Sequence, residues 1–591
     1  MAQKTKLELL WIGKYDELPG IEPRILIEDP AYSFGSPEQG VLINGKKWNG
    51  NMLIHGDNLL ALKSLEQDYA GCVKCIYIDP PYNTGSAFEF YDDGVEHSIW
   101  LSLMRERLLS LKNLLSDDGF IFVQIDDNEQ AYLTLIMDEI FGRTNRINTI
   151  CVNMSNLSGV KITSAINGKR FPKVKEYVLL YAKNKGVGTL HIPRVAKEKW
   201  DKEYNLIIPE MTLEMSEMYE NEDSTSIEAH LADLSIVSLK KYMADNGIDD
   251  ANESWKYENA YRIFASKPNS ALLNRAKELD YDYPLAIVNN ASGTPKLIKT
   301  DFNRETKTAR IELVCANTNS TTYLGDHWDD IVTTGGVGQE GGVVFTNGKK
   351  PEKLISRIIE CASKEGDLVL DSFLGSGTTA AVAHKMRRRF IGIEMGEHAY
   401  THSYKRLKDV VLGKETTGIT TKVGWHGGGG FRFYELAPSL LKNDSHGHLV
   451  INKEYNADML AAAMAKMEGF TYEPSTDIFW KQGHSSETDF IFTTTQFVTV
   501  ESLGAILDTM ADGESLLVCC KAFQPECKNF SSRISVKKIP SVLLGRCEFD
   551  HDDYSLNIIE LPQTEEIDDS EDQDNSPETI SDSTSSEPSL F

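Results

Sequence analysis

The chain has 591 residues, of which 41% are hydrophobic, so we expect roughly two to four domains with substantial cores. A formal net charge of −27 argues against a protein that coats nucleic acid through uniform positive charge. No apolar run approaches the roughly 18 residues of a membrane span, and residues 1–10 lack the features of a secretory signal, so we expect a cytoplasmic protein.

Residues 1–50 give no strong signal and are interpreted as a lead-in. The first α/β signal is the short apolar run at residues 53–55, which ends in a turn and is followed by helical spacing over residues 59–65. Asp57 lies in that turn, where it could cap the helix or accept a hydrogen bond from a ligand amine. Capping is the more common role of such an aspartate.

A second apolar run, at residues 73–78, predicts a short buried strand that ends in Asp79-Pro80-Pro81-Tyr82. The prolines cannot continue a sheet, so they predict a stiff loop at the carboxyl end of the strand, where open α/β sheets bind ligands. A carboxylate, a rigid carbonyl and a ring suit a flat base with an exocyclic amine. The alternative, which the tetrapeptide alone does not exclude, is a solvated Asp79 and a core Tyr82.

The nine cysteines form no paired Cys-x-x-Cys frame, so the sequence predicts neither a metal site nor a disulfide framework. The lone pair Cys72 and Cys75 is interpreted as core and loop thiols. A helix over residues 98–115, a strand over 119–125 and a helix from a cap at Asn128 to residue 142 follow. This alternation predicts a mainly parallel sheet.

The strand–helix rhythm breaks from about residue 145 to residue 324. A basic stretch with the aromatic residues Phe171, Tyr177 and Tyr181 interleaved lies at its start, a pattern that suits contact with a phosphate backbone. The alternative is a strand face, solvated or buried, around residues 177–182. The candidate DNA-binding residues are Lys161, Lys169, Arg170, Lys173 and Lys175.

A second constellation begins with a predicted strand over residues 368–371. The turn Ser372-Phe373-Leu374-Gly375-Ser376-Gly377-Thr378-Thr379 leads from it into a helix, and the next strand ends at Glu394. Glycines at such a turn let a ligand approach the backbone, and Glu394 lies 17 residues past Gly377, near the roughly 20 expected of a ribose-hydroxyl acceptor. The turn is not a Walker loop, so an ATP-driven motor is not expected.

The remainder of the chain carries no chemical constellation. Residues 436–560 predict an α/β segment, with strands at 489–493 and 515–520 and a helix at 503–511. From Asp552 onward there are 13 Asp and Glu, and no Lys or Arg follows Arg546, so residues 561–591 are expected to be a disordered acidic tail.

Taken together, the two constellations resemble the β group of DNA amino-methyltransferases that use S-adenosylmethionine. Asp79-Pro80-Pro81-Tyr82 matches the catalytic motif of that family, and residues 371–378 match its cofactor motif, in the permuted order of the β group. The extended pattern is most similar to the modification subunits of type III restriction–modification systems; it comprises residues 55–58, residues 347–351 and residues 390–394. An aspartate at the head of the catalytic motif favours adenine N6 over cytosine N4.

The resemblance implies a Rossmann-like α/β core with a mainly parallel sheet, formed by residues 51–150 and 326–435. A target-recognition domain would be inserted at residues 151–325, and a C-terminal α/β domain would follow at 436–560. It further implies a homodimer that methylates a flipped adenine in double-stranded DNA, with a restriction subunit as a possible partner. Alternatives are a DNA-recognition subunit in which methylation is secondary or lost, a cytosine-N4 methyltransferase, and an RNA or protein amine methyltransferase.

Roles for single residues also follow from the resemblance. Asp79 and the Pro80 carbonyl would accept the adenine amine, and Tyr82 would stack on the base. Glu394 would bind the cofactor ribose. The other residues implied to bind the cofactor are Asp57 (adenine), Phe373 (packing on the adenine), Gly375 and Gly377 (close approach of the methionine part), Lys350 and Pro351 (methionine end), and Asp371 and Thr378 (members of the motif).

Overall fold

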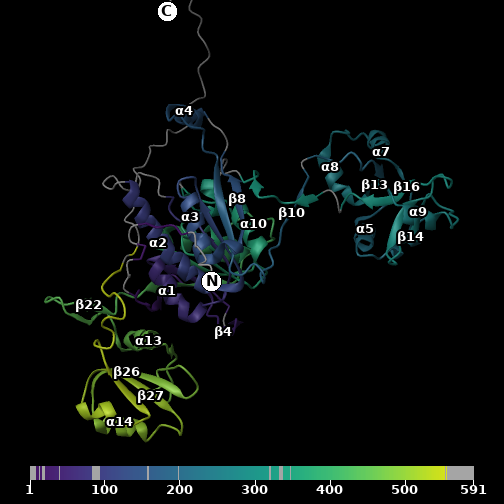
Figure 1. Cartoon of the computed structure of the whole chain (residues 1–591). Helices are drawn as coiled ribbons and strands as arrows, with labels where there is room; N and C mark the ends of the chain where they lie inside the picture. The colour runs from purple at the N-terminus through teal and green to yellow at the C-terminus, as the bar shows by residue number, and fades with distance from the viewer. Residues whose placement is uncertain are drawn as a thin grey trace, which may run out of the picture.

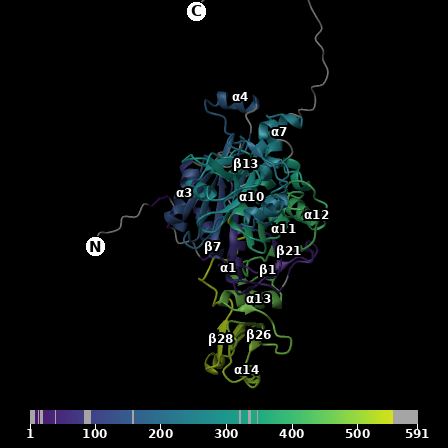
Figure 2. The same cartoon turned by 90° about the vertical axis from the view of Figure 1, so that its right-hand side faces the viewer.

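The computed structural model describes residues 8–11, 14–15, 20–38, 40–82, 93–155, 159–197, 199–317, 321–331, 337–345, 348–552 and 554. A central domain carries an inserted domain on one side and a C-terminal domain below it (Figure 1). After a 90° turn the C-terminal domain still lies below the core, and helix α4 still projects above it (Figure 2).

The central domain is built on an eleven-stranded sheet. Six neighbouring strands run parallel, in an order that is not their order in the chain, which confirms the predicted mainly parallel α/β core. In sheet order these strands are β21 (Gly430–Leu436), β5 (Asn51–His55), β20 (Arg389–Glu394), β19 (Leu368–Asp371), β6 (Val73–Ile78) and β7 (Leu115–Ile125).

Both edges of this sheet carry antiparallel pairings. Beyond β7 the chain adds an antiparallel pair and a short parallel strand: β9 (Lys175–Ala182), β8 (Arg146–Asn153) and β18 (His327–Trp328). At the other edge β21 pairs antiparallel with β1 (Leu26–Glu28) and β2 (Phe34–Gly35), so part of the expected lead-in belongs to the core. A hairpin of β3 (Leu42–Ile43) and β4 (Lys46–Lys47) lies between them and β5 in sequence.

Helices cover both faces of the sheet, which explains why its strands are continuous apolar runs. Alternate residues of β6 enter different cores: Ile76 and Ile78 face one, whereas Cys75 and Tyr77 face the other. The first core also takes residues of α1 (Asn58–Tyr69), α2 (Asp93–Leu114) and α3 (Gln130–Met137). The second takes residues of α10 (Glu352–Ala362), α11 (Thr378–Lys385) and α12 (Lys405–Val411).

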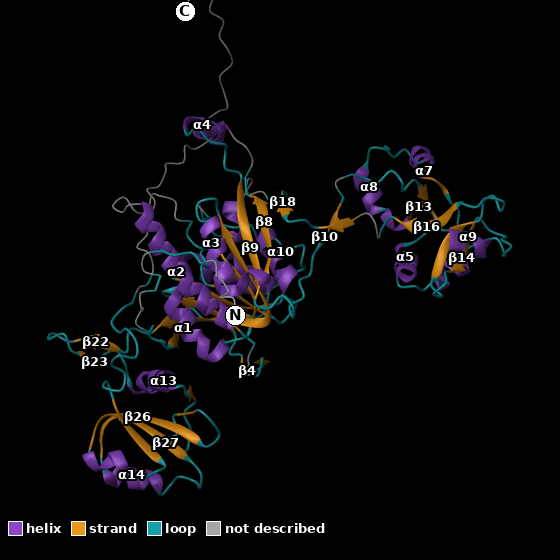
Figure 3. Cartoon of the chain, viewed as in Figure 1, coloured by secondary structure: helices purple, strands orange, loops and turns teal. Residues whose placement is uncertain are grey.

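The inserted domain begins later than predicted. Residues 151–182 belong largely to the core sheet, through β8 and β9, and the domain is entered and left through a two-stranded neck of β10 (Arg194–Ala196) and β17 (Thr321–Tyr323) (Figure 3). The prediction that it starts at residue 151 is therefore wrong. The sequence did not reveal the two strands because β9 pairs antiparallel with both β7 and β8, which departs from the expected alternation of parallel strands and helices.

Within the inserted domain an antiparallel sheet of six strands packs with short helices. The strand order is β12 (Val237–Ser238), β11 (Leu206–Ile207), β13 (Ile263–Pro268), β16 (Arg310–Cys315), β15 (Pro295–Lys299) and β14 (Leu285–Asn289). The helices are α5 (Leu213–Glu220), α6 (Thr225–His230), α7 (Leu239–Asp245), α8 (Glu253–Glu258) and α9 (Ser270–Ala276).

The C-terminal domain is α/β, as its sequence predicts. A hairpin of β22 (Leu441–Asn443) and β23 (Leu449–Ile451) precedes α13 (Ala457–Glu468) and a five-stranded sheet in which the last three strands are parallel. Helix α14 (Val500–Leu507) begins at a Thr499 capping box and ends before residue 511. The sheet contains β24 (Thr471–Tyr472), β25 (Gly483–His484), β26 (Asp489–Val498), β27 (Ser515–Phe523) and β28 (Ile534–Lys538).

Two smaller expectations differ from the structure. Strand β7 starts at Leu115 rather than at residue 119. Asn128 does not cap α3, because Glu129 holds the N-cap position, and the Asn128 backbone and side-chain amides donate to Asp126 at 2.8 and 3.1 Å. The acidic tail at 561–591 lies outside the described residues. Within the described part of the chain, none of the helices has the length and apolar character needed to cross a bilayer.

Candidate active site

The two sequence constellations lie at one edge of the sheet. Strands β6 and β19 pair in parallel, with Cys75 opposite Val369 and Ile76 opposite Leu370, so two carboxylates lie at the same end of the pair, one directly after β6 and one at the last position of β19. These are Asp79 and Asp371. Although the two motifs are almost 300 residues apart in the chain, they therefore share the edge at which open α/β sheets bind ligands.

A cavity of about 550 Å³ opens beside Tyr82, the last residue of the Asp79-Pro80-Pro81-Tyr82 tetrapeptide. Tyr82, Glu176 and Lys350 contribute to its lining, together with Met154 and Phe345. The Phe345 ring also approaches the glycine turn, because its Cζ lies 4.0 Å from the position that a Cβ on residue 375 would occupy. The volume is in the range of small-molecule sites, and Phe345, which lines the cavity, is the lining residue that comes near the glycine turn.

The carboxylate of Asp79 is held by two donors. The Tyr82 hydroxyl donates to Asp79 Oδ1 at 2.7 Å, and the Lys350 ammonium lies 3.1 Å from Oδ2. The loop itself is anchored from α2, since the buried Trp100 indole donates to the Pro81 carbonyl at 2.8 Å. The stiff loop expected from the two prolines is thus fixed at both its carboxylate and its backbone.

Burial raises the pKa of Asp79, and the charge of Glu176 adds to this effect, while Lys350 opposes it. Burial alone would lower the pKa of Lys350, but the two carboxylates outweigh it, and the net pKa is raised. The ammonium is accordingly kept charged between two acidic side chains.

Asp371 stabilises the turn that follows β19. Its carboxylate accepts the Phe373 backbone N–H at 2.9 Å and the Thr379 hydroxyl at 2.6 Å, and burial raises its pKa to about 7. Gly377 begins α11 with a φ of +80°, and a Cβ there would lie 3.0 Å from Ser403 Cα. Only glycine satisfies both the left-handed conformation and this close approach.

Glu394 closes the turn from the neighbouring strand. Its Oε2 accepts the Gly375 N–H at 2.6 Å and its Oε1 accepts the Gly396 N–H at 3.0 Å. Burial raises the pKa of this carboxyl as well. A carboxylate has about four acceptor positions, so these two contacts leave capacity for further donors at the sheet edge.

Asp57 acts as a helix cap in the structure. Its Oδ1 accepts the Leu59 and Leu60 N–H groups at 2.9 and 3.1 Å. Its Oδ2 accepts the Tyr554 N–H at 3.1 Å and lies 3.5 Å from Arg107 Nη2. Of the two roles considered for Asp57, helix capping and binding of a ligand amine, the structure shows capping.

The candidate DNA-binding cations divide into two groups. Lys173 pairs with Asp126 at 3.4 Å, and Lys175 pairs with Asp127 at 2.6 Å. Lys169 and Arg170 are exposed at the end of α4 (Gly159–Asn167), beside Phe171, which is 91% exposed. The Lys161 side chain lies outside the described residues, and Tyr177 and Tyr181 lie in core strand β9, which corrects their reading as interleaved DNA contacts.

A family profile described as DNA methylase matches residues 73–405, more than half of the chain. The chain belongs to the DNA methylase family. The match contains both the tetrapeptide and the glycine turn, and it spans the inserted domain between them.

Curated relatives of this DNA methylase are named as Mod subunits. The "probable type III restriction-modification enzyme HindVI Mod subunit" of Haemophilus influenzae is 36% identical over 410 residues, 66% of this chain and 54% of that protein. The type III EcoPI Mod subunit of Escherichia phage P1 is 30% identical over 69% of this chain and 67% of its own. The chain thus matches about half the length of the first relative and two thirds of the second.

Similarity to solved structures is weaker. The cytosine-N4-specific PvuII DNA methyltransferase is 13% identical, with 60% of this chain and 86% of that chain covered and a TM-score of 0.32. We draw no conclusion from a TM-score this low. The description of the core as a mainly parallel α/β sheet rests on the strand order of this methylase itself.

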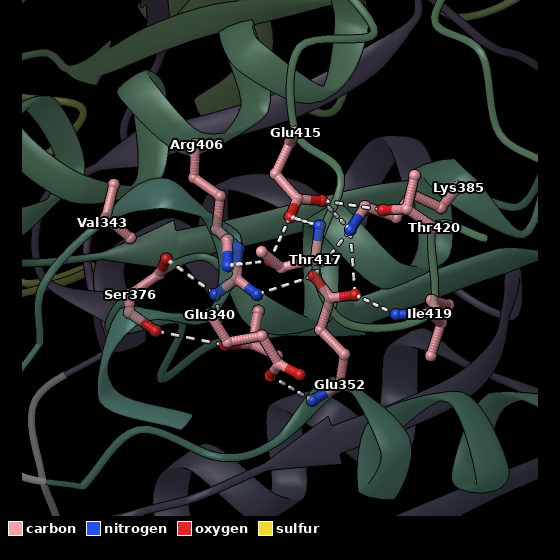
Figure 4. A network of polar contacts seen from close by, with 12 residues as sticks. Glu340, Val343, Glu352, Ser376, Lys385, Arg406, Glu415, Thr417, Ile419 and Thr420 are labelled. Carbon is pink, nitrogen blue, oxygen red and sulfur yellow. Dashed lines mark hydrogen bonds and ion pairs between the residues drawn. The ribbon is translucent and has the colours of Figure 1, made fainter. Parts of the chain in front are cut away.

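Two features of the site escaped the sequence motifs. Glu176 reaches the tetrapeptide from β9, a strand with no motif of its own. The second feature is a buried charge network beneath the glycine turn, in which Glu352 accepts from Lys385 and Arg406, each at 2.8 Å (Figure 4). The only sequence signal was the position of Glu352 directly after Lys350-Pro351, at the start of a helix.

This network links several segments that are distant in sequence. Lys385 also pairs with Glu415, and Arg406 donates to the Thr378 hydroxyl at 2.7 Å, so the guanidinium supports the first turn of α11. Gly341 packs directly on it, because a Cβ there would lie 2.3 Å from Arg406 Nε. The network therefore ties the glycine turn to the segment that precedes Lys350.

Proposed function

We propose that this methylase transfers the methyl group of S-adenosylmethionine to the N6 amine of adenine in double-stranded DNA. The observation that carries the proposal is the parallel pairing of β6 with β19, which puts the Asp79 loop and the Gly375–Gly377 turn at one edge of the sheet. A cavity of about 550 Å³, large enough to admit a base, lies beside Tyr82. The names of the Mod relatives support the same conclusion.

The chemistry follows from the nature of the amine. The lone pair on the adenine N6 nitrogen is delocalised into the ring, so the nitrogen is a poor nucleophile. Asp79 and the Pro80 carbonyl would each accept one N–H and draw the nitrogen toward tetrahedral geometry. This is catalysis by positioning and by preorganised charge. Stacking of the flipped base on Tyr82 would offset part of the unstacking cost, by about 1–3 kcal/mol.

The residues at the glycine turn fit the cofactor. Gly375 has no side chain, and the nearest atom to a Cβ there would be Phe345 Cζ at 4.0 Å, which suits close approach of the methionine portion; Glu394 has acceptor capacity for ribose hydroxyls. Asp371 accepts from Thr379, and Thr378 accepts from Arg406, so both residues stabilise the glycine turn. They would affect cofactor binding indirectly, through the shape of that turn. When bound, the cofactor supplies the electrophilic methyl group on its sulfonium.

Helix α4 and the segment after it are the proposed DNA contact from the core. Helix α4 projects above the core (Figure 1), and it connects the ends of β8 and β9 that lie at the carboxyl edge of the parallel strands. Lys169 and Arg170 are exposed. Lys173 and Lys175 would contribute less, because neighbouring aspartates already balance their charge. The inserted domain is the proposed target-recognition domain.

Assembly is proposed from the relatives alone. Type III Mod subunits give the precedent for a restriction subunit as partner, and the resemblance implies a homodimer. Size-exclusion chromatography with light scattering would show whether the full chain is a dimer in solution.

The catalytic assignment has a direct test. Asp79→Ala should abolish transfer of labelled methyl groups to DNA, because one amine acceptor is lost, while cofactor binding by calorimetry should stay within about threefold, since Asp79 does not line the glycine turn. Transfer at near wild-type rate by this variant would contradict the role of Asp79.

A further inference from the structure

A third acidic side chain meets the tetrapeptide from outside both motifs. Glu176 Oε2 lies 2.8 Å from the Tyr82 hydroxyl, whose single proton can be donated either to Asp79 or to Glu176, and 3.2 Å from the Lys350 ammonium. The Gln124 amide donates to the same oxygen, and Gln124 is in turn held by the buried Tyr77 hydroxyl at 2.6 Å. Glu176 is thus oriented by β7 and β6 and directed at the two groups that also hold Asp79.

This arrangement bears on how the adenine amine could reach Asp79. Both carboxylate oxygens already have a donor: Tyr82 on Oδ1 and Lys350 on Oδ2. An incoming N–H competes with these donors for the lone pairs and the negative charge of Asp79, and a buried donor that loses its acceptor is unfavourable unless another acceptor is within reach. Glu176 is such an acceptor, because both displaced groups already contact it.

We propose that Glu176 is a positioning residue for methyl transfer, which takes over the Tyr82 hydroxyl and the Lys350 ammonium when the amine binds Asp79. The inference rests on the proposed function and adds a residue to it. Without Glu176, both donors would stay on Asp79 and compete with the base for its oxygens.

Methyl transfer releases a proton, and Asp79 is placed to accept it. The new N–C bond forms as the S–C bond breaks, and the bonding pair leaves with sulfur. The nitrogen is then positively charged and gives up one proton, for which Asp79 is the nearest base. Asp79, Glu176 and Lys350 together carry one net negative charge, so Asp79 can take up that proton while the Lys350 ammonium stays paired with Glu176.

The pH dependence of single-turnover methyl transfer reports on this arrangement. The groups that face Asp79 are Lys350 from the α10 side, Glu176 from β9, Tyr82 on its own loop, and Tyr77 and Asp371 from the sheet. Asp79 must be ionised to accept the amine, so the rate falls as the pH drops through its pKa. Glu176→Gln removes a neighbouring negative charge, and this should lower the pKa of Asp79 and move the acid limb down by about half a unit or more.

The loss of the acceptor is tested separately. Glu176→Ala should lower the single-turnover rate about tenfold or more, with affinity for S-adenosylmethionine within about twofold of wild type, and Glu176→Gln should recover much of that rate because its amide oxygen can still accept from Tyr82. Asp138→Asn is the matched control. Asp138 is another half-buried carboxylate that accepts a tyrosine hydroxyl from β9, at 2.7 Å from Tyr181, away from the tetrapeptide. It should leave both rate and acid limb unchanged.

Full-length protein, labelled S-adenosylmethionine and mixed-sequence duplex DNA suffice for the assay. A wild-type rate and an unmoved acid limb in both Glu176 variants would overturn the inference. If Glu176→Ala does not fold by circular dichroism, the acid limb of Glu176→Gln decides alone. If wild-type protein itself transfers no methyl group to DNA, the proposed function fails rather than the role of Glu176.

Discussion

The buried network beneath the glycine turn makes a quantitative prediction for Arg406→Met. The side chains of Glu352, Lys385, Arg406 and Glu415 are at most 1% exposed, and they balance as two negative and two positive charges. Removal of one guanidinium leaves one buried negative charge uncompensated, a change that costs about 3–5 kcal/mol in proteins. Glu352 keeps Lys385 and the Ile419 N–H at 2.9 Å, so we expect the lower end of that range.

Thermal unfolding followed by circular dichroism measures the effect. A loss of about 3 kcal/mol corresponds to a decrease of roughly 6–12 °C in the Tm of a domain of 150–250 residues. The control is Lys63→Met, which removes a half-exposed partner of Glu66 at 2.9 Å and should cost less than about 1 kcal/mol.

Charge balance is the physical reason for the expected loss, and a second variant isolates it. Arg406→Met combined with Glu352→Gln restores equal numbers of buried charges and should recover part of the Tm. The reasoning is refuted if Arg406→Met unfolds within about 2 °C of wild type, as the Lys63→Met control should.

Two further predictions concern the cofactor and DNA. Gly377→Asp should weaken binding of S-adenosylmethionine by at least about tenfold in calorimetry, because residue 377 has a φ of +80° and its Cβ would meet Ser403 Cα at 3.0 Å. Gly447→Asp is the control with the same backbone strain, since Gly447 has a φ of +79° and a Cβ there would meet no atom within 4 Å; equal affinities for the two variants would contradict the reasoning. Lys169→Ala with Arg170→Ala should weaken DNA binding and flatten the slope of log affinity against log salt by roughly 1.8, about 0.9 for each lost phosphate contact. The matched pair Lys173→Ala with Lys175→Ala should change the slope less, because Asp126 and Asp127 already neutralise those ammonium groups; a larger effect in this pair would show that the contact lies elsewhere.

The sequence predicted those strands that are followed directly by a functional motif. Strands followed directly by Asp79-Pro80-Pro81 or by the glycine turn were recognisable, because each apolar run ends in residues that cannot extend a sheet. Their pairing followed from the general rule that such loops gather at one edge of a parallel sheet. The α/β character of residues 436–552 was also predictable from apolar runs separated by helical spacing.

The remainder depends on contacts between distant segments. Strands β8 and β9 join the core as an antiparallel pair linked by α4, and this left no alternation by which to recognise them. Glu176 comes to the site only because β9 lies next to β7, and Arg406 becomes a support of the glycine turn only because α12 packs over α11. No local pattern around either residue encodes these neighbours.

The identity of the methylated atom is the most direct test of the account. Duplex DNA incubated with the wild-type protein and S-adenosylmethionine can be digested to nucleosides and analysed by mass spectrometry. We predict N6-methyldeoxyadenosine in the wild-type reaction and none with Asp79→Ala. N4-methyldeoxycytidine in place of the adenine product, or methyl transfer that survives in the Asp79→Ala reaction, would contradict it.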